Sequence, residues 1–163
     1  MLASFPAGDK FGLVPASILI VDDDPDLLEL LRITLKQAGY APRTAATGKE
    51  ALSKAKRYPP DLIILDVILP DINGFSVCEE LRAQDATAAL PVILMTVLPG
   101  EFPRLVGKEL GTVAFLNKPF EVQEMVAQVN RSLSQHPTSP ASRAPVPEPA
   151  VQPVPSTGAR PVC

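Results

Sequence analysis

The sequence predicts an α/β fold, a doubly wound five-stranded parallel sheet in the order 2-1-3-4-5 with helices on both faces. Short apolar runs alternate with helical patterns through residues 17–134. Several runs are apolar on both faces, as is typical of strands buried within a parallel sheet. The second run contains Pro42, which cannot donate a ladder hydrogen bond and so places that strand at an edge. An edge position for the second strand favours the order 2-1-3-4-5 over 3-2-1-4-5.

The first half of this region is expected to supply three strands and two helices. Asp24 followed by Pro25 is typical of a helix N-terminus, because aspartate caps free N–H groups and proline suits the first helical position. Thr47 and Glu50 form a capping-box pattern before the second helix. The expected elements are a strand at 17–21, a helix from 25 that ends at Gly39, a strand at 40–45, a helix from 48 to about 58 and a strand at 61–66. The inward stripe of the first helix is expected to be Leu27, Leu30, Leu31, Thr34 and Leu35.

The second half is expected to continue the alternation, with one weakly helical segment. A third helix is expected to begin at Asn73-Gly74, and strands are expected at 91–96 and 113–116. Between these strands, prolines and glycines oppose helix over 97–111, so that only 104–110 is expected to be helical. The final helix is expected at 120–133, and its inward residues are expected to be Val122, Met125, Val126, Val129 and Leu133.

Composition excludes several classes of protein. The formal charge of -3 and the pI near 5.2 argue against a nucleic-acid-binding surface. Two cysteines, Cys78 and Cys163, are too few for a disulfide framework or a cysteine metal site. No apolar run reaches the ~18 residues that a membrane span needs, and no signal peptide is recognisable, which indicates a cytoplasmic protein. Residues 1–16 are expected to be a disordered leader and 135–163 a proline-rich disordered tail.

Polar side chains follow the expected strands at the point where each strand ends. Asp66 closes the apolar run 61–66, and taken alone such an aspartate is usually a helix cap or loop anchor. The carboxyl ends of parallel strands meet at one edge of a sheet, where ligands bind in doubly wound folds. The residues expected at that edge, from four strands, are Asp22, Asp23, Asp66, Thr96 and Lys118.

This set of side chains indicates a particular chemistry. Two carboxylates ~4 Å apart repel by about 4 kcal/mol at an effective dielectric of 20, so three of them need a shared proton or a bound cation. Carboxylate oxygens without histidine or cysteine suit a hard divalent ion, and Mg²⁺ best. The hydroxyl and the ammonium can bind an anion. The carboxylates, the hydroxyl and the ammonium together therefore indicate a site at which one carboxylate receives a phosphoryl group.

Four segments together resemble the receiver domain of two-component response regulators. They are Ile18-Leu-Ile-Val-Asp22-Asp23-Asp24-Pro25, Leu65-Asp66 through Pro70 to Gly74, Val92-Ile-Leu-Met-Thr96, and Lys118-Pro119-Phe120. Each segment is weak alone, but their order and spacing match the family across about 16–133. The resemblance implies a flavodoxin-like receiver sandwich, in agreement with the fold expected above.

The resemblance also implies a role for each carboxylate. Asp66 would be the phosphoacceptor. Asp23 would bind Mg²⁺ directly and Asp22 mainly through water, while the backbone carbonyl of Ile68 would supply a further ligand.

The resemblance implies a switch next to this site. Lys118 would pair with a phosphoryl oxygen, and a cis bond before Pro119 would direct its ammonium inward. Thr96 would move toward the phosphoryl group and Phe115 would follow from exposed to buried. From the residues alone, Thr96 could be only a strand-end cap, Phe115 only a strand residue and Lys118 a solvated charge.

Three residues depart from the usual family pattern. Val97 replaces the small residue that leaves room for the phosphodonor. Ile68 and Leu98 occupy positions that often carry polar residues, and apolar groups there cannot orient an attacking water. We therefore expect a long-lived phosphoaspartate. The proline- and glycine-rich segment 97–111 puts the usual output surface in doubt.

The favoured interpretation is a stand-alone response regulator, not an enzyme beyond its own phosphorylation and dephosphorylation at Asp66. Its expected partners are a sensor histidine kinase or phosphotransfer protein and an unidentified downstream protein, with no nucleic acid and no membrane. Phosphorylation-dependent dimerisation is a further option. The alternatives are a degenerate receiver that acts as an interaction module and, less favoured, a phosphatase of the haloacid-dehalogenase type. Such phosphatases carry a second acid two residues after the nucleophile, where this chain has Ile68.

Overall fold

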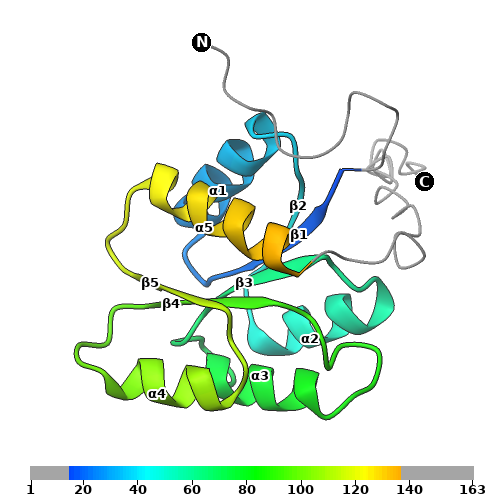
Figure 1. Ribbon diagram of the computed structural model, residues 1–163, viewed down its shortest axis with the longest axis vertical. Coiled ribbons are helices and arrows are strands. Elements are labelled where there is room, and N and C mark those ends of the chain that lie inside the picture. Colours follow the sequence, from blue (N-terminus) through cyan, green and yellow to red (C-terminus); the bar gives the residue numbers. More distant parts are fainter. Residues whose placement is uncertain (1–14, 137–163) are drawn as a thin grey trace, which may run out of the picture.

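A computed structural model describes residues 15–136. Five parallel strands form one sheet in the order β2-β1-β3-β4-β5, as the sequence predicts (Figure 1). The elements are β1 Ser17–Val21, α1 Pro25–Gln37, β2 Ala41–Ala45, α2 Gly48–Arg57, β3 Leu62–Asp66, α3 Gly74–Arg82, β4 Val92–Thr96, α4 Phe102–Glu109, β5 Ala114–Asn117 and α5 Val122–Gln135. The expected leader falls almost wholly, and the expected tail mostly, outside the described residues.

The order of the strands follows from the edge position of β2. In the parallel pairing of β1 with β2, Pro42 lies opposite Ile18. On its other side β1 pairs with β3, which continues to β4 and β5. Proline at the edge strand leaves the central ladders intact, since no inner strand has to accept from its missing N–H. The sheet order therefore places the ends of β1 and β3 side by side.

Helices cover both faces of the sheet and enclose two separate hydrophobic cores. Helices α1 and α5 lie on one face, and α2, α3 and α4 lie on the other (Figure 1). The three inner strands are buried almost completely, which explains why their runs are apolar on both faces. In the described part of the chain, no helix is long and apolar enough to cross a membrane.

The expected helix caps are present. Asp24 accepts a hydrogen bond from the backbone N–H of Asp26 at 3.0 Å, and Pro25 begins α1. Thr47 accepts from the N–H of Glu50 at 3.1 Å. The reciprocal bond differs from a standard capping box, because the Glu50 carboxylate accepts from Ala46 rather than from Thr47, at 3.0 Å.

The inward stripe of α1 was predicted wrongly at one position. Leu30 is 49% exposed, whereas Leu28 is buried together with Leu31 and Leu35. A spacing of three or four residues fits more than one set of leucines in this leucine-rich helix. The orientation of the helix on the sheet decides which set is buried.

The prediction for α4 was also wrong, because the helix begins at Phe102 rather than at Arg104. Pro103 lies in the first helical turn, where backbone N–H groups have no intrahelical acceptor and proline costs little. Gly107 lies within the helix, and glycine is needed there because a Cβ would lie 2.8 Å from Phe115 and 2.9 Å from Leu94. The observed boundaries of the other elements lie within two residues of the expected ones, and those of β1 are as expected.

We predict that the two neighbouring leucines of α1 differ sharply in their effect on stability. Leu31→Ala should lower the free energy of unfolding by about 2–5 kcal/mol, because it leaves a cavity in the core. Leu30→Ala should change it by less than about 0.5 kcal/mol, because its side chain lies largely in solvent. Urea unfolding followed by circular dichroism measures both. Equal losses would contradict the observed orientation of α1.

Candidate functional site

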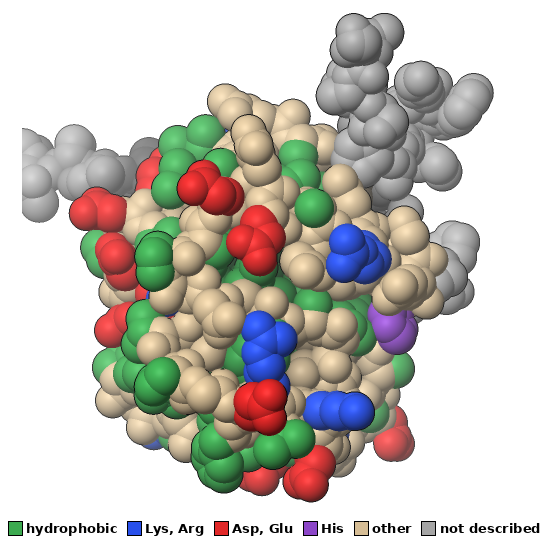
Figure 2. All heavy atoms as spheres, turned by 60° about the vertical axis from the view of Figure 1, so that its left-hand side comes forward, with side chains coloured by type: hydrophobic (Ala, Val, Ile, Leu, Met, Phe, Trp, Pro, Cys, Tyr) green, Lys and Arg blue, Asp and Glu red, His purple; other side chains and the backbone are tan. Residues whose placement is uncertain are grey.

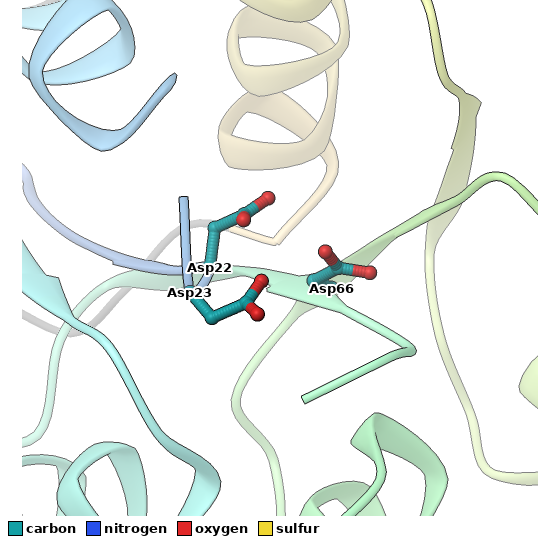
Figure 3. A group of neighbouring side chains, drawn as sticks. All are labelled: Asp22, Asp23 and Asp66. Atoms are coloured by element: carbon teal, nitrogen blue, oxygen red, sulfur yellow. The ribbon is translucent and has the colours of Figure 1, made fainter. Parts of the chain in front are cut away.

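Three aspartates meet where β1 and β3 end. Asp22 and Asp23 follow β1, and Asp66 is the last residue of β3, the neighbouring strand. One carboxylate oxygen from each of the three lies within 4.8 Å of the other two. Figure 3 shows the carboxyl groups of Asp22 and Asp23 on the side that faces Asp66. Asp22 and Asp66 are buried, while Asp23 is exposed and gives the cluster access to solvent.

Lys118 supplies a positive charge inside this cluster. Its Nζ lies 2.5 Å from Oδ2 of Asp22 and 2.7 Å from Oδ2 of Asp66, so that one ammonium bridges two carboxylates. The lysine reaches this position from the end of β5, and its backbone N–H donates to the carbonyl of Thr96 at 2.8 Å. Together, three carboxylates and one ammonium carry a formal charge of minus two. A divalent cation would balance that charge.

The ionisation of Asp22 and Lys118 reflects their burial and their contact. Burial raises the pKa of the Asp22 carboxyl above its ordinary value, although hydrogen bonds from Lys118 and from the backbone of Asp24 oppose this effect. Burial alone would lower the pKa of Lys118, but its bonds to Asp22 and Asp66 outweigh burial and raise it. Lys118 therefore keeps its charge at neutral pH.

Local contacts hold Asp66 and the residues after it in place. Its Oδ1 accepts a hydrogen bond from the N–H of Ile68 at 3.0 Å. The backbone then turns back, and the N–H of Gly74 donates to the carbonyl of Val67 at 2.8 Å. A Cβ on Gly74 would lie 2.4 Å from the carbonyl oxygen of Asp66. Glycine is thus the residue that lets α3 begin against the acceptor strand.

Thr96 and Phe115, the expected switch residues, lie on neighbouring strands. Thr96 is buried at the end of β4, one residue past the partner of Asp66 in the sheet. Its hydroxyl accepts from the N–H of Leu98 at 2.9 Å, the bond expected of a strand-end cap. Phe115 is half-buried on β5, and the guanidinium of Arg104 lies over its ring at 5.5 Å.

Exposed apolar side chains border the acidic cluster. Figure 2 shows one face of the molecule, on which hydrophobic, acidic and basic side chains are all exposed. Ile68 is 47% exposed in the loop after β3, and after β4 Val97 is 60% and Leu98 37% exposed.

The peptide bond between Lys118 and Pro119 is cis, as the family resemblance implies.

The donor atoms at the site fit Mg²⁺. The candidate metal-binding group consists of carboxylates, which are hard oxygen ligands, and it contains neither histidine nor cysteine. The exposed position of Asp23 would also let a bound ion retain several waters, as Mg²⁺ prefers. Cys78, the one cysteine among the described residues, is buried on α3, and burial raises the pKa of its thiol to about 11.

The sequence analysis assigned no role at the site to three residues that shape it. Gly74 packs on the backbone of Asp66, Arg104 lies over Phe115, and the carboxylate of Asp71 caps α2 from the loop after β3. Each contact joins residues from different elements, and periodicity and turn chemistry describe only neighbours in sequence. For Gly74 a partial signal existed, since Asn-Gly before a helix indicates a tight turn.

We predict that Gly74→Ala destabilises the protein although alanine is the better helix former. Helix propensity alone would favour alanine by about 1 kcal/mol. The new methyl group would press against backbone atoms of Asp66 and Val67, and such overpacking costs about 1–3 kcal/mol. Urea unfolding measures the outcome. Glu79→Ala, an exposed change on the same helix, is the control, and a Gly74→Ala variant as stable as that control would contradict the prediction.

Comparison with known proteins assigns a family to this arrangement. Residues 18–130 match the response regulator receiver domain. The chain is 41% identical over 116 residues to the DNA-binding dual master transcriptional regulator RpaA of Synechocystis sp., a match that covers 71% of this chain and 48% of RpaA. The alkaline phosphatase synthesis transcriptional regulatory protein PhoP of Bacillus subtilis matches with the same identity and the same coverage. This chain thus spans about half the length of these relatives.

Solved structures agree with this assignment. Chemotaxis protein CheY4 of Vibrio cholerae superposes with a TM-score of 0.70 at 33% identity, over 74% of this chain and 100% of CheY4. A two-component response regulator from Clostridium difficile gives a TM-score of 0.70 at 28% identity, over 76% of this chain and 99% of the other. With its strand order and its three clustered aspartates, the chain therefore belongs to the response regulator receiver domain family.

Proposed function

We propose that this chain accepts a phosphoryl group on Asp66 from a histidine kinase or a phosphotransfer protein, and that the phosphorylated form signals by binding another protein. The observation that carries the proposal is the position of Asp66. Its carboxylate closes a buried strand within 4.8 Å of two other carboxylates and 2.7 Å from a lysine ammonium. Membership of the receiver family implies a histidine kinase as the donor-side partner.

The residues around Asp66 support an acceptor role. A carboxylate oxygen would attack phosphorus, the bond to the donor nitrogen would break, and an acyl phosphate would form on Asp66. The ammonium of Lys118 already lies at this carboxylate and would pair with a phosphoryl oxygen. The half-exposed loop residue Ile68 and the exposed Asp23 border the side open to a donor.

Mg²⁺ is the proposed cofactor. Asp23 and Asp66 would bind it through carboxylate oxygens, Asp22 mainly through water, and Ile68 through its backbone carbonyl. When bound, the ion neutralises charge on the phosphoryl oxygens and helps to position them for transfer. Lys118 would then be free to exchange a carboxylate partner for the phosphoryl group.

A change at Thr96 and Phe115 is the proposed output of the site. The Thr96 hydroxyl would exchange its bond to the Leu98 N–H for one to a phosphoryl oxygen. Phe115 packs beside Gly107 and below Arg104, so its ring can respond to movement at the end of β4. Helix α4, β5 and α5 would then form the surface that a downstream protein reads.

The proposal also covers the class of molecule that the whole protein binds and where it acts. RpaA is named as a DNA-binding regulator, but the match covers only about half of its length. The formal charge of -3 does not favour phosphate contacts by this chain, so we propose protein partners rather than nucleic acid. We further propose that it acts in the cytoplasm, without catalysis beyond its own phosphorylation and dephosphorylation.

Two other functions are less well supported. A degenerate receiver would act as an interaction module without phosphorylation, and the unusual Val97 favours it, but the clustered aspartates and Lys118 do not. A phosphatase that uses Asp66 as its nucleophile would need a second acid two residues further on. Ile68 occupies that position and offers no proton donor.

We predict that the chain gains a single phosphoryl group when it is incubated with Mg²⁺ and a small acyl phosphate or phosphoramidate. Intact-mass spectrometry should detect one added phosphoryl mass. The adduct should be absent in Asp66→Asn, because the amide is not a nucleophile, and absent after chelation of the metal. Asp26→Asn, at an exposed aspartate in α1, is the matched control and should keep the adduct. No adduct with several donors and a histidine kinase would favour the degenerate receiver.

We also predict that the phosphoaspartate has a half-life longer than seconds. Ile68 and Leu98 are 47% and 37% exposed beside the site and offer no side-chain donor or acceptor to an attacking water. Time-resolved intact mass after removal of the donor measures the half-life. Ile68→Asn should shorten it, whereas Ile33→Asn, a change at a similarly exposed isoleucine on α1, should leave it unaltered. A wild-type half-life of seconds would refute this expectation.

A further inference from the structure

The loop after Asp66 is tied to a helix that is distant in sequence. Asp71 lies in that loop, and both of its carboxylate oxygens accept backbone hydrogen bonds from the start of α2. The N–H of Gly48 lies 2.8 Å from Oδ1, and the N–H of Lys49 lies 2.8 Å from Oδ2. These residues are 23 and 22 positions away in the chain. Asp71 thus connects the loop after Asp66 to α2.

This connection completes the capping of α2. The first turn of any helix leaves backbone N–H groups without intrahelical partners. Thr47 accepts from the third of them, Glu50, so that Asp71 accepts from the first two. A carboxylate is also favoured at the positive end of a helix. Partial desolvation would raise the pKa of Asp71, but the backbone hydrogen bonds outweigh it and bring that pKa to about 2.

Packing reinforces the hydrogen bonds. Ile72, the residue after Asp71, lies against Gly48 so closely that a Cβ there would be 2.5 Å from its Cγ1. Ile72 and Leu69 of the same loop pack on the buried core between the sheet and α2 and α3. The loop is therefore anchored by apolar contacts as well as by the carboxylate.

The same loop carries a proposed ligand of the metal. Ile68 is held on one side by Asp66, whose Oδ1 accepts from its N–H at 3.0 Å. On the other side the chain is fixed by Asp71, three residues further on. The backbone carbonyl of Ile68 lies between these two attachments. Loss of the second attachment would leave that carbonyl free to change its direction.

We infer that Asp71 is a positioning residue of the metal site, which holds the carbonyl of Ile68 in place by tying its loop to the N-terminus of α2. The inference rests on the proposed function, because it concerns the same Mg²⁺ site. Asp71 itself lies on the surface and binds backbone N–H groups, so it acts on the metal only through the loop.

The test compares two ways of removing a cap from α2 in the full chain. Asp71→Ala removes the cap and the connection, whereas Thr47→Ala removes only a cap made within the helix segment. Urea unfolding records the stability of each variant. Isothermal titration with MgCl₂ measures the dissociation constant of Mg²⁺, and ¹⁵N relaxation measures the backbone order of residues 68–70 without metal.

Asp71→Ala should weaken Mg²⁺ binding by about tenfold, the lower end of the loss caused by removing an outer partner of a metal site. It should also reduce the backbone order of the loop. Thr47→Ala should leave both unchanged at a similar loss of stability. Asp71→Asn, which retains one acceptor oxygen and serves if the alanine variant does not fold, should lie between Asp71→Ala and wild type.

The outcomes separate the two proposals. Mg²⁺ binding by Asp71→Ala at the wild-type dissociation constant overturns the positioning role and leaves the proposed function intact. An equal loss of binding in Thr47→Ala also overturns it, since a cap alone would then account for the effect. Wild-type protein that binds no Mg²⁺ overturns the proposed metal site and, with it, this inference.

Discussion

The contact between Lys118 and two aspartates is the interaction on which the arrangement of the site depends. Three carboxylates within 4.8 Å repel one another strongly in a partly buried environment. The ammonium bridges Asp22 and Asp66 and opposes that repulsion without a bound metal. It comes from the end of β5, whereas its partners come from β1 and β3. The cluster therefore exists only when three strands of the sheet end at the same level.

The surrounding fold supplies that condition through buried strands and short contacts. The inner strands are buried on both faces, and a slip of one residue would exchange the side chains that fill the two closely packed cores. Gly74 and the Oδ1 bond of Asp66 then fix the backbone at the acceptor. Burial still raises the pKa of Asp22, so the fold disfavours a negative charge on this carboxyl at the position where a cation is proposed to bind.

Much of the fold could be predicted from sequence because its signals are local. The strand runs are short, apolar and bounded by turn residues, and Asp24, Pro25 and Thr47 mark helix starts through bonds within a few residues. The predictions failed where the local sequence was compatible with two different structures. In α1, both Leu28 and Leu30 fit helical spacing, and contact with the sheet selected Leu28. In α4, proline and glycine oppose helix on average, yet their positions in the first turn and beneath Phe115 tolerate both residues.

By itself the sequence determined which residues stand at the ends of the strands, and therefore which carboxylates, hydroxyl and ammonium can meet. It determined this because strand ends and turns are encoded by neighbouring residues. Only the tertiary structure decided how these groups pair. Lys118 and Asp22 are 96 residues apart, and Asp71 and Gly48 are 23 apart. Such contacts depend on the packing of whole elements, since a hydrogen bond needs its partners within about 3 Å whatever their separation in the chain.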